Sequence, residues 1–224
     1  MKLSVNKKIL DSNDKAAQRN RQRFAELGLA CINVVSSPGS GKTTLLARTV
    51  RDLAGRLRMG VIEGDIKTDT DARAIRAAGA PAVQIETEGA CHLSARQVHA
   101  ALDELPLGEL DMVFIENVGN LVCPSAFDLG ENRRVVVLSV PEGDDKPCKY
   151  PGTFAVADVI VINKIDLLEY IEFSLERVLA DISKVNRGAK VFEVSARTGR
   201  GMEQWYEWLL SHTAKSNIRN QNAK

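Results

Sequence analysis

One short stretch constrains this chain more than any other: an apolar run, a glycine-containing turn and the start of a helix follow one another. The run Ile32–Val35 predicts a buried strand, and Ser36–Thr43 reads Ser-Ser-Pro-Gly-Ser-Gly-Lys-Thr. Glycines let the backbone approach a phosphate closely, and N–H groups of the loop and the following helix point at the anion. We therefore predict a phosphate-binding loop, although Ser36 stands where the usual pattern has glycine.

The individual positions of this loop are expected to share the work of holding a nucleotide. Lys42 is placed to neutralise phosphate charge, and the hydroxyl of Thr43 is placed to ligate Mg²⁺. The remaining contacts are assigned to the rest of the loop and the first helical turn, namely Ser37, Pro38, Gly39, Ser40, Gly41 and Thr44. Nucleotide binding is therefore the function that the sequence indicates most directly.

Short apolar runs alternate with longer mixed segments from residue 30 onward. This alternation predicts an α/β protein with the three-layer P-loop NTPase fold, in which about seven mainly parallel strands are covered by helices on both faces. Strands are expected near 31–35, 59–62, 82–85, 112–115, 134–140, 159–163 and 191–194, and helices near 43–57, 69–78, 92–105, 169–185 and 202–210. Before the first strand, Asp11–Asp14 offer caps for a surface helix that Gly28 ends.

A second motif predicts which base the nucleotide carries. Asn163-Lys164-Ile165-Asp166 ends the apolar run Val159–Ile162 and has the N-K-x-D form of guanine-specific GTPases. The Asp166 carboxylate can accept both guanine N–H donors, whereas adenine would leave it unpaired. Ser195, Ala196 and Arg197 resemble the S-A-K loop whose backbone amide meets the guanine oxygen, with Arg197 in place of lysine.

These motifs divide the chain into three predicted parts. Residues 1–29 form an N-terminal helical extension packed on the core, 30–211 a GTPase domain, and 212–224 a basic tail that frays. The net charge of +1 disfavours nucleic acid as a partner. No apolar run approaches the roughly 20 residues that cross a bilayer, and four cysteines are too few for a secreted disulfide scaffold. We therefore expect a cytoplasmic protein without a membrane partner.

Two acidic residues end predicted strands on the side of the phosphate loop, where open α/β sheets bind ligands. Glu116-Asn117-Val118-Gly119 matches the D-x-x-G pattern with Glu in place of Asp. We assign Glu116 to the Mg²⁺ shell, the Gly119 amide to the γ-phosphate, and Asp65 to the orientation of water or Mg²⁺; simple capping of the next helix is the alternative for Asp65. Asn120 follows where many GTPases carry a water-orienting glutamine, so we predict slow hydrolysis.

Three further side chains form a partial transition-metal set. Cys91 and His92 lead into a predicted helix, and Cys123 follows Gly119 by four residues. Thiolate and imidazole suit Zn²⁺ or Ni²⁺, and a helix N-terminus is expected to lower the pKa of Cys91. Three ligands leave a tetrahedral ion one short, so water or a second subunit must complete it. The alternative is that these three side chains pack within the protein and bind no metal ion. Outside the set, Cys31 is expected in a buried strand, Cys148 in a loop or core, and His99 and His212 on helix surfaces.

Taken together, these residues resemble the HypB family of hydrogenase nickel-incorporation GTPases from about Ile9 to Trp208. The likeness is carried by Asn13-Asp14 with Asn20-Arg21, Ser36–Thr43, Glu63-Gly64-Asp65, Gly89–His92, Glu116–Pro124 and Glu142–Pro147. It implies a GTP-dependent homodimer that binds nickel or zinc through Cys91, His92 and Cys123 at the subunit interface. It also implies two partners: a HypA-type zinc- and nickel-binding metallochaperone and, directly or indirectly, the hydrogenase large-subunit precursor.

The sequence therefore predicts a switch in which GTP and Mg²⁺ order Gly119–Cys123 and hydrolysis releases the metal ion. One alternative is a urease-accessory GTPase, although the Cys-Pro-His motif usual there is broken by Cys123-Pro124-Ser125. A P-loop small-molecule kinase is another, but it leaves Asn163–Asp166 without a purpose. A non-enzymatic metal-storage dimer with structural nucleotide is the third. Phosphate release and repeated GTP turnover separate these classes.

Overall fold

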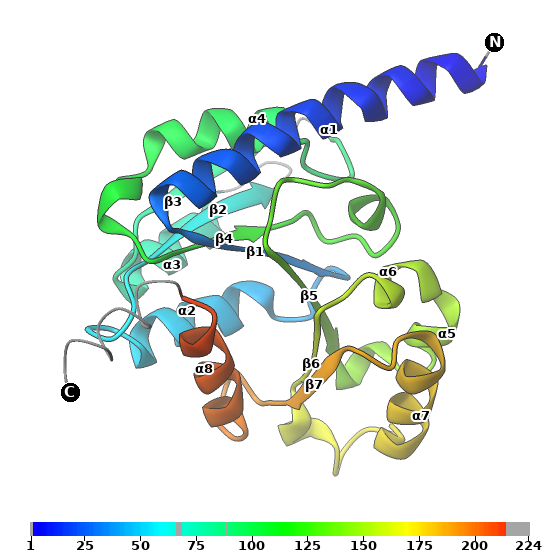
Figure 1. Cartoon of the computed structure of the whole chain (residues 1–224). Coiled ribbons are helices and arrows are strands. Elements are labelled where there is room, and N and C mark those ends of the chain that lie inside the picture. Colours follow the sequence, from blue (N-terminus) through cyan, green and yellow to red (C-terminus); the bar gives the residue numbers. More distant parts are fainter. Residues whose placement is uncertain (1, 66–68, 88, 214–224) are drawn as a thin grey trace.

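The structure is a computed structural model that describes residues 2–65, 69–87 and 89–213, with side chains from residue 10 onward. Seven parallel strands form one sheet in the order β3-β2-β4-β1-β5-β6-β7 (Figure 1). Their bounds are β1 Ala30–Ser36, β2 Met59–Asp65, β3 Ala82–Glu86, β4 Met112–Glu116, β5 Arg133–Ser139, β6 Val159–Asn163 and β7 Lys190–Glu193. The predicted parallel, P-loop NTPase sheet is therefore confirmed.

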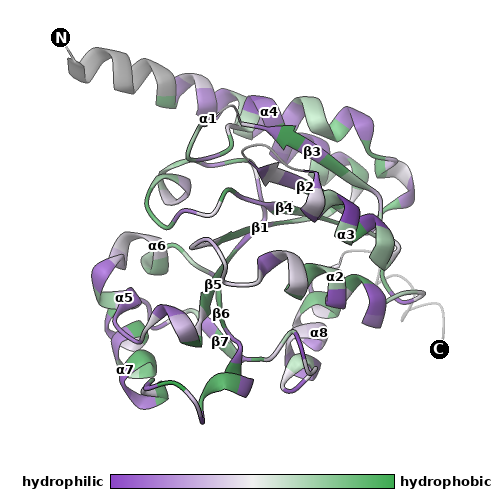
Figure 2. Ribbon diagram, turned by 180° about the vertical axis from the view of Figure 1, so that it is seen from behind, coloured by the Kyte–Doolittle hydropathy of each residue, from purple (hydrophilic) through white to green (hydrophobic). Residues whose placement is uncertain are grey.

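Helices cover both faces of this sheet. The bounds of the longer ones are α1 Lys2–Leu27, α2 Lys42–Asp52, α3 Thr70–Ala78, α4 Ala95–Ala101, α7 Leu175–Val185 and α8 Met202–Ser211. Helices α2, α3 and α8 pack on one face, whereas α1, α4 and α7 pack on the other. Figure 2 shows hydrophobic residues in the strands between these layers and hydrophilic residues on the outer helix faces.

The central strands are apolar on both sides because each side meets a layer of helices. In β4, Met112 and Phe114 point into the core shared with α2 and α3, and Val113 and Ile115 point into the core under α4. Trp205 of α8 is fully buried and donates to the Thr49 hydroxyl of α2 at 2.9 Å. This continuous burial fixes the carboxyl ends of β1, β2 and β4, from which the candidate site is built.

Several helix boundaries differ from those expected. Helix α4 begins at Ala95 instead of His92, because Ser94 and Gln97 form a reciprocal capping box there. In the same way α7 begins after Ser174, whose hydroxyl accepts from Arg177 N. The short helices α5 Lys146–Lys149 and α6 Pro151–Ala155 were not predicted, since four or five residues carry no helical periodicity.

Helix α1 differs most from the sequence-based expectation. It begins well before Asp11–Asp14, so those residues do not cap it. Asn13 and Asn20 are buried instead, and the helix packs along α4. Gly28 ends the helix as predicted, with a φ of +61° and a Leu29 N to Phe24 O hydrogen bond.

Two further predictions concern the ends of the chain and the membrane. The predicted basic tail, 212–224, lies outside the described residues from position 214 onward. The ring of His212, its first residue, rests on Trp208 at 4.5 Å between centroids. Among the helices that the structure describes, none combines the length and the apolar character that a membrane crossing needs.

Candidate nucleotide and metal site

The phosphate loop connects β1 to α2 and is shaped by its glycines. Gly39 and Gly41 adopt φ values of +73° and +91°, which side chains with a Cβ rarely tolerate. A Cβ on Gly41 would also lie 2.7 Å from the Asn163 amide nitrogen. The buried Ser36 hydroxyl accepts from Lys42 Nζ at 2.8 Å and holds this ammonium group beneath the loop.

A cleft of about 490 Å³ opens above this loop at the carboxyl ends of the strands. A Cβ on Gly119 would lie 3.0 Å from the Pro38 backbone, so the absence of a side chain lets the two loops approach. Among the predicted nucleotide and magnesium residues, the cleft brings together Pro38, Gly39, Gly41, Lys42, Thr43, Thr44, Asp65, Glu116, Gly119 and Lys164.

The acidic floor of the cleft fits a magnesium ion. Thr43 Oγ1 donates to Glu116 Oε1 at 2.8 Å, while the second Glu116 oxygen is buried without a hydrogen-bond partner. A hydroxyl and a free carboxylate oxygen beside Lys42 are the hard donors that Mg²⁺ takes next to phosphate. Asp65 also lines the cleft; the residue that precedes α3 as its N-cap is Asp69, so Asp65 does not cap that helix.

Glu63 is a site residue to which the sequence analysis gave no role. The register between β2 and β4 places it opposite Glu116, and both carboxyls are buried. Burial raises the pKa of both, and the neighbouring negative charge of Glu116 raises that of Glu63 further. Because the two carboxyls are buried on neighbouring strands, negative charge on both at once is unfavourable, and the raised pKa of Glu63 favours its protonated form beside Glu116. A glutamate inside an apolar strand was the signal that could have found it.

The base-recognition loop is tied directly to the phosphate loop. Asn163 Nδ2 donates to the Ser40 carbonyl at 2.9 Å, and its Oδ1 accepts from the Ala196 amide at 3.1 Å. Lys164, at a φ of +63°, donates from Nζ to the Gly39 carbonyl at 2.5 Å. Asn163 therefore links the phosphate loop to the loop that contains Ala196, although the two loops are distant in sequence.

The predicted guanine acceptor is held in place by the last loop. Ser195 Oγ donates to Asp166 Oδ1 at 2.6 Å, which orients the half-buried carboxylate. Arg197 is exposed, and its carbonyl accepts from Arg48 of α2 at 3.2 Å. The side chain of Arg197 thus takes no part in this anchoring.

A second cluster lies beside the cleft and joins the three predicted metal ligands. One donor atom from each of Cys91, His92 and Cys123 lies within 4.8 Å of the others. Cys91 is exposed, and the His92 ring stacks on Phe127 with centroids 3.8 Å apart. Phe127 was not singled out from the sequence; it fixes the imidazole plane from the loop that follows Cys123.

The protonation of this cluster corrects one expectation. Cys91 precedes α4 by four residues, too far for the helix N-terminus to lower its pKa. A hydrogen bond with the Cys123 thiol, together with some burial, raises the pKa of Cys91 instead. Burial lowers the pKa of His92, so this imidazole is neutral and free to bind a metal ion at pH 7.

Asn120 occupies the position that was expected to orient water, yet its side chain is directed towards the metal cluster. Its Nδ2 donates to the Cys91 carbonyl at 3.3 Å, and its Oδ1 accepts from Val122 N at 2.8 Å. The connection that begins at Gly119 therefore touches one metal ligand through Asn120 and supplies another, Cys123.

With this geometry in view, comparisons with known proteins define the family. The model described as CobW/HypB/UreG, nucleotide-binding domain, matches residues 30–193. The hydrogenase maturation factor HypB of Rhizobium leguminosarum bv. viciae is 51% identical over 221 residues, which is 99% of this chain and 74% of that protein. The chain belongs to the HypB family. The resemblance read from the motifs is thereby confirmed.

Two further HypB relatives extend the comparison. A crystal structure of HypB from Helicobacter pylori in complex with nickel superposes with a TM-score of 0.86 at 40% identity, covering 93% of this chain and 96% of that one. The hydrogenase/urease maturation factor HypB of Helicobacter hepaticus is 43% identical over 220 residues, covering 96% of this chain and 89% of that protein. The HypB fold thus spans nearly the whole chain.

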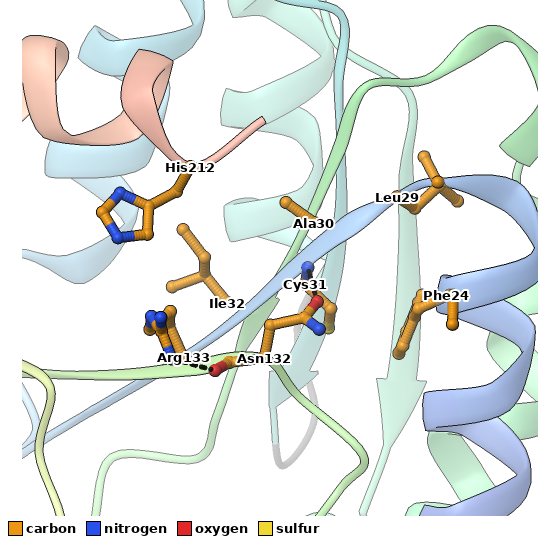
Figure 3. A pocket seen from close by; sticks show the side chains of 10 residues that line it. Phe24, Leu29, Ala30, Cys31, Ile32, Asn132, Arg133 and His212 are labelled. Carbon is orange, nitrogen blue, oxygen red and sulfur yellow. Dashed lines mark hydrogen bonds between the residues drawn. The ribbon is translucent and has the colours of Figure 1, made fainter. Parts of the chain in front are cut away.

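The other thiols and histidines of this HypB-family chain lie away from the cluster. Cys31 is buried on β1 as expected, where burial raises its pKa, and Cys148 is exposed on α5. His99 is not a plain surface residue, because its Nδ1 hydrogen-bonds Asn20 Oδ1 at 2.8 Å. Cys31, Asn132 and His212 line a separate cavity of about 350 Å³ at the amino ends of β1 and β5, opposite the nucleotide cleft (Figure 3).

Proposed function

We propose that this chain is a GTP-dependent nickel-insertion accessory protein for [NiFe]-hydrogenase maturation. It hydrolyses GTP to GDP and phosphate and couples this reaction to the binding and release of Ni²⁺ or Zn²⁺. The observation that carries the proposal is the connection Gly119–Cys123. It begins at Gly119, the predicted γ-phosphate contact in the cleft, and ends at Cys123, one of the predicted metal ligands. Between them, Asn120 hydrogen-bonds the backbone of Cys91, another predicted metal ligand. A segment ordered by GTP therefore moves two metal ligands.

In the nucleotide cleft, each predicted residue has a distinct task. When the nucleotide binds, the Lys42 ammonium group gives up its hydrogen bond to the Ser36 hydroxyl and contacts the phosphates instead. The backbone of Ser37–Thr44 surrounds these phosphates. Thr43, Glu116 and Asp65 hold Mg²⁺, which when bound neutralises the charge that develops on the phosphate oxygens. Asp65 also orients the attacking water. Hydrolysis is slow because the Asn120 amide is occupied by Cys91 and Val122.

Guanine selection rests on Asp166, which Ser195 orients through one of its two oxygens. Its carboxylate accepts from the two adjacent guanine N–H groups, while a backbone amide of the loop Ser195–Arg197 donates to the guanine oxygen. An adenine base offers no such donor pair and leaves the carboxylate unmatched, which disfavours ATP.

The metal is cargo, held by two thiolates and an imidazole. Cys91, His92 and Cys123 supply three of the four ligands that a tetrahedral ion takes, and a water molecule or the second subunit of a homodimer supplies the fourth. A HypA-type metallochaperone exchanges metal with this site, and the hydrogenase large-subunit precursor receives it directly or indirectly. The exposure of Cys91 leaves a path for that exchange.

The experiment that tests the coupling measures Ni²⁺ affinity with the protein loaded with GDP or with a slowly hydrolysed GTP analogue. We expect the two affinities to differ by about 5-fold or more, the lower range of ordinary coupling energies. Equal affinities would contradict the coupling while leaving both binding sites in place.

A urease-accessory role is the second candidate, because the relative from Helicobacter hepaticus carries both hydrogenase and urease in its name. Here Cys123-Pro124-Ser125 lacks the histidine of the Cys-Pro-His motif. Nickel transfer to a hydrogenase precursor and to a urease apoprotein, measured side by side, distinguishes the two. Phosphate release without any acceptor, over many turnovers, argues against a kinase and against a storage dimer.

A further inference from the structure

Two segments carry the metal ligands, and both lie against helix α1. The first runs from Cys91 and His92 to the start of α4 at Ala95, and the second from Cys123 into the loop 127–131. Helices α1 and α4 run side by side (Figure 1). Three polar side chains on α1 contact these segments, and two of them are buried.

Asn13 joins the two segments with one amide group. Its Oδ1 accepts from Ala95 N at 2.9 Å, which satisfies a backbone donor in the first turn of α4, three residues after His92. Its Nδ2 donates to the Asp128 carbonyl at 2.7 Å, one residue after the Phe127 ring on which His92 stacks. A single side chain therefore sets the spacing between both sides of the metal cluster.

Asn20 repeats this bridge two helical turns later. Its Nδ2 donates to the Ala95 carbonyl at 2.8 Å and to the Leu129 carbonyl at 2.9 Å, while its Oδ1 lies 2.8 Å from His99 Nδ1. The side chain is fully buried and fully paired. Such a network is rigid, because breaking any bond leaves a buried polar group unmatched.

Arg21 and the backbone of Gly130 complete the contact. Arg21 forms two hydrogen bonds to the Asp128 carboxylate, at 2.9 and 2.8 Å. Gly130 has a φ of +89°, and a Cβ there would lie 2.5 Å from the Ala17 carbonyl of α1. The loop after Cys123 can therefore rest directly on the helix.

We propose that Asn13, Asn20 and Arg21, called here the α1 brace, position the metal ligands by holding the two ligand-bearing segments in register. Metal binding otherwise has to order two loops, and that entropy would be subtracted from the affinity. Because the α1 brace already holds both loops in place before the metal ion binds, this entropic cost no longer reduces the affinity. This inference rests on the proposed metal-binding function of Cys91, His92 and Cys123.

The test compares the unmodified chain with the variants Asn13→Ala and Arg21→Ala, and all three are loaded with GDP. Ni²⁺ affinity is measured by competition with a chromophoric chelator, and the nickel–thiolate absorption band reports the ligand geometry. We expect affinity to fall about 10-fold in Asn13→Ala, the lower end for partners that orient metal ligands, and the band to weaken. GDP affinity should remain unchanged in both variants.

Arg23→Ala is the matched control. Arg23 is also on α1 and forms an ion pair of 2.7 Å with Asp103 beyond the end of α4, away from both ligand-bearing segments. Its removal should leave Ni²⁺ affinity and the absorption band as in the unmodified protein. An equal loss in Arg23→Ala would overturn the brace in favour of general docking of α1.

Thermal unfolding separates positioning from stability. If Asn13→Ala and Arg21→Ala only lower the unfolding midpoint and bind Ni²⁺ normally at a temperature where they are folded, the proposal is wrong. Asn20→Ala should give the largest loss of affinity; if it does not fold, the other two variants decide. Cys123→Ser tests the underlying function: unchanged Ni²⁺ binding in that variant would refute the metal site itself, and the brace with it.

Discussion

At the scale of single residues, side chains of the predicted phosphate loop hydrogen-bond to one another within the protein, and some of them are also expected to contact the ligand. The Ser36 hydroxyl accepts from Lys42 Nζ and from Ser40 Oγ, and donates to the Ser37 carbonyl. This arrangement keeps a buried ammonium group satisfied beneath an open cleft. The serine that breaks the usual glycine pattern thus has a role in the structure, which the pattern alone did not indicate.

The first prediction at this scale concerns Lys42→Ala. Removing the ammonium group should weaken GTP binding about 100-fold, because truncating one member of a buried charge pair costs about 2–5 kcal/mol. The fold should persist, since Lys42 lies in the first turn of α2 beside the open cleft and its removal takes nothing from the hydrophobic core. Calorimetric titration with GTP, with circular dichroism as the measure of folding, provides the check. Arg51→Ala, an exposed cation on the same helix, is the control, and undiminished GTP binding in Lys42→Ala would discredit the phosphate-loop assignment.

At the scale of elements, α1 is more than an extension, because its polar face is inserted between α4 and the loop 127–131. Asn13 and Asn20 bond backbone groups of both. Backbone partners of this kind depend on the conformation of the loop and not on its side chains. The helix therefore recognises the folded form of the segment that follows Cys123.

The pH dependence of this contact follows from Asp128. Burial alone would raise the pKa of Asp128, but the bonds from Arg21 and from Gly130 N outweigh it and hold this pKa below its usual range; Glu131 is the other charged neighbour. A lowered pKa means that the stabilisation is complete above the ordinary value of about 4 and is lost as pH falls through the lower, folded-state value. The pair is half exposed, so its contribution is about 1 kcal/mol or less.

We therefore expect the stability of the unmodified protein to fall more steeply than that of Asp128→Asn as the pH is lowered from about 4. Urea unfolding midpoints measured at several pH values test this expectation. Asp103→Asn, which alters the ion pair of Arg23, serves as the comparison. Parallel curves for the unmodified protein and Asp128→Asn would contradict the assigned role of this carboxylate.

At the scale of the whole molecule, the two sites share one connection between β4 and β5. Glu116 ends β4 in the nucleotide cleft, Gly119 meets the phosphate loop, and Cys123 reaches the metal cluster. Asn120 stands between them and holds the Cys91 backbone. Linkage requires that any effect of nucleotide on metal affinity be matched by an equal effect of metal on nucleotide affinity.

Asn120→Ala should therefore reduce the ratio of Ni²⁺ affinities between the GTP-analogue and GDP states, while each site still binds its ligand. The reason is that the mutation removes the hydrogen bond to Cys91 but none of the metal donors. Both sides of the linkage can be measured: nucleotide affinity with and without Ni²⁺, and the reverse. Ser125→Ala, which removes the bond to the Val122 carbonyl on the same connection, is the control. An unchanged ratio in Asn120→Ala would show that the coupling does not pass through this residue.

The sequence by itself predicted the parallel sheet and singled out Cys91, His92 and Cys123, whose donor atoms the structure brings together. The phosphate-loop and guanine-motif assignments also came from the sequence. Each of these is a local pattern: alternating apolar runs, a strand–glycine–helix junction, or a motif at the end of a strand. The pattern of each can be found within a short stretch of sequence, although contacts between distant segments bring the motifs together. The same local reasoning failed for the pKa of Cys91, which depends on the distant thiol of Cys123.

The tertiary structure alone decided which side chains support these motifs. Glu63 became part of the site because the register of β2 against β4 sets it beside Glu116. Asn13 and Asn20 contact carbonyls more than one hundred residues away, at separations of 115 and 109. Such pairings arise from packing of whole elements, and no short pattern encodes which backbone group a buried amide will meet.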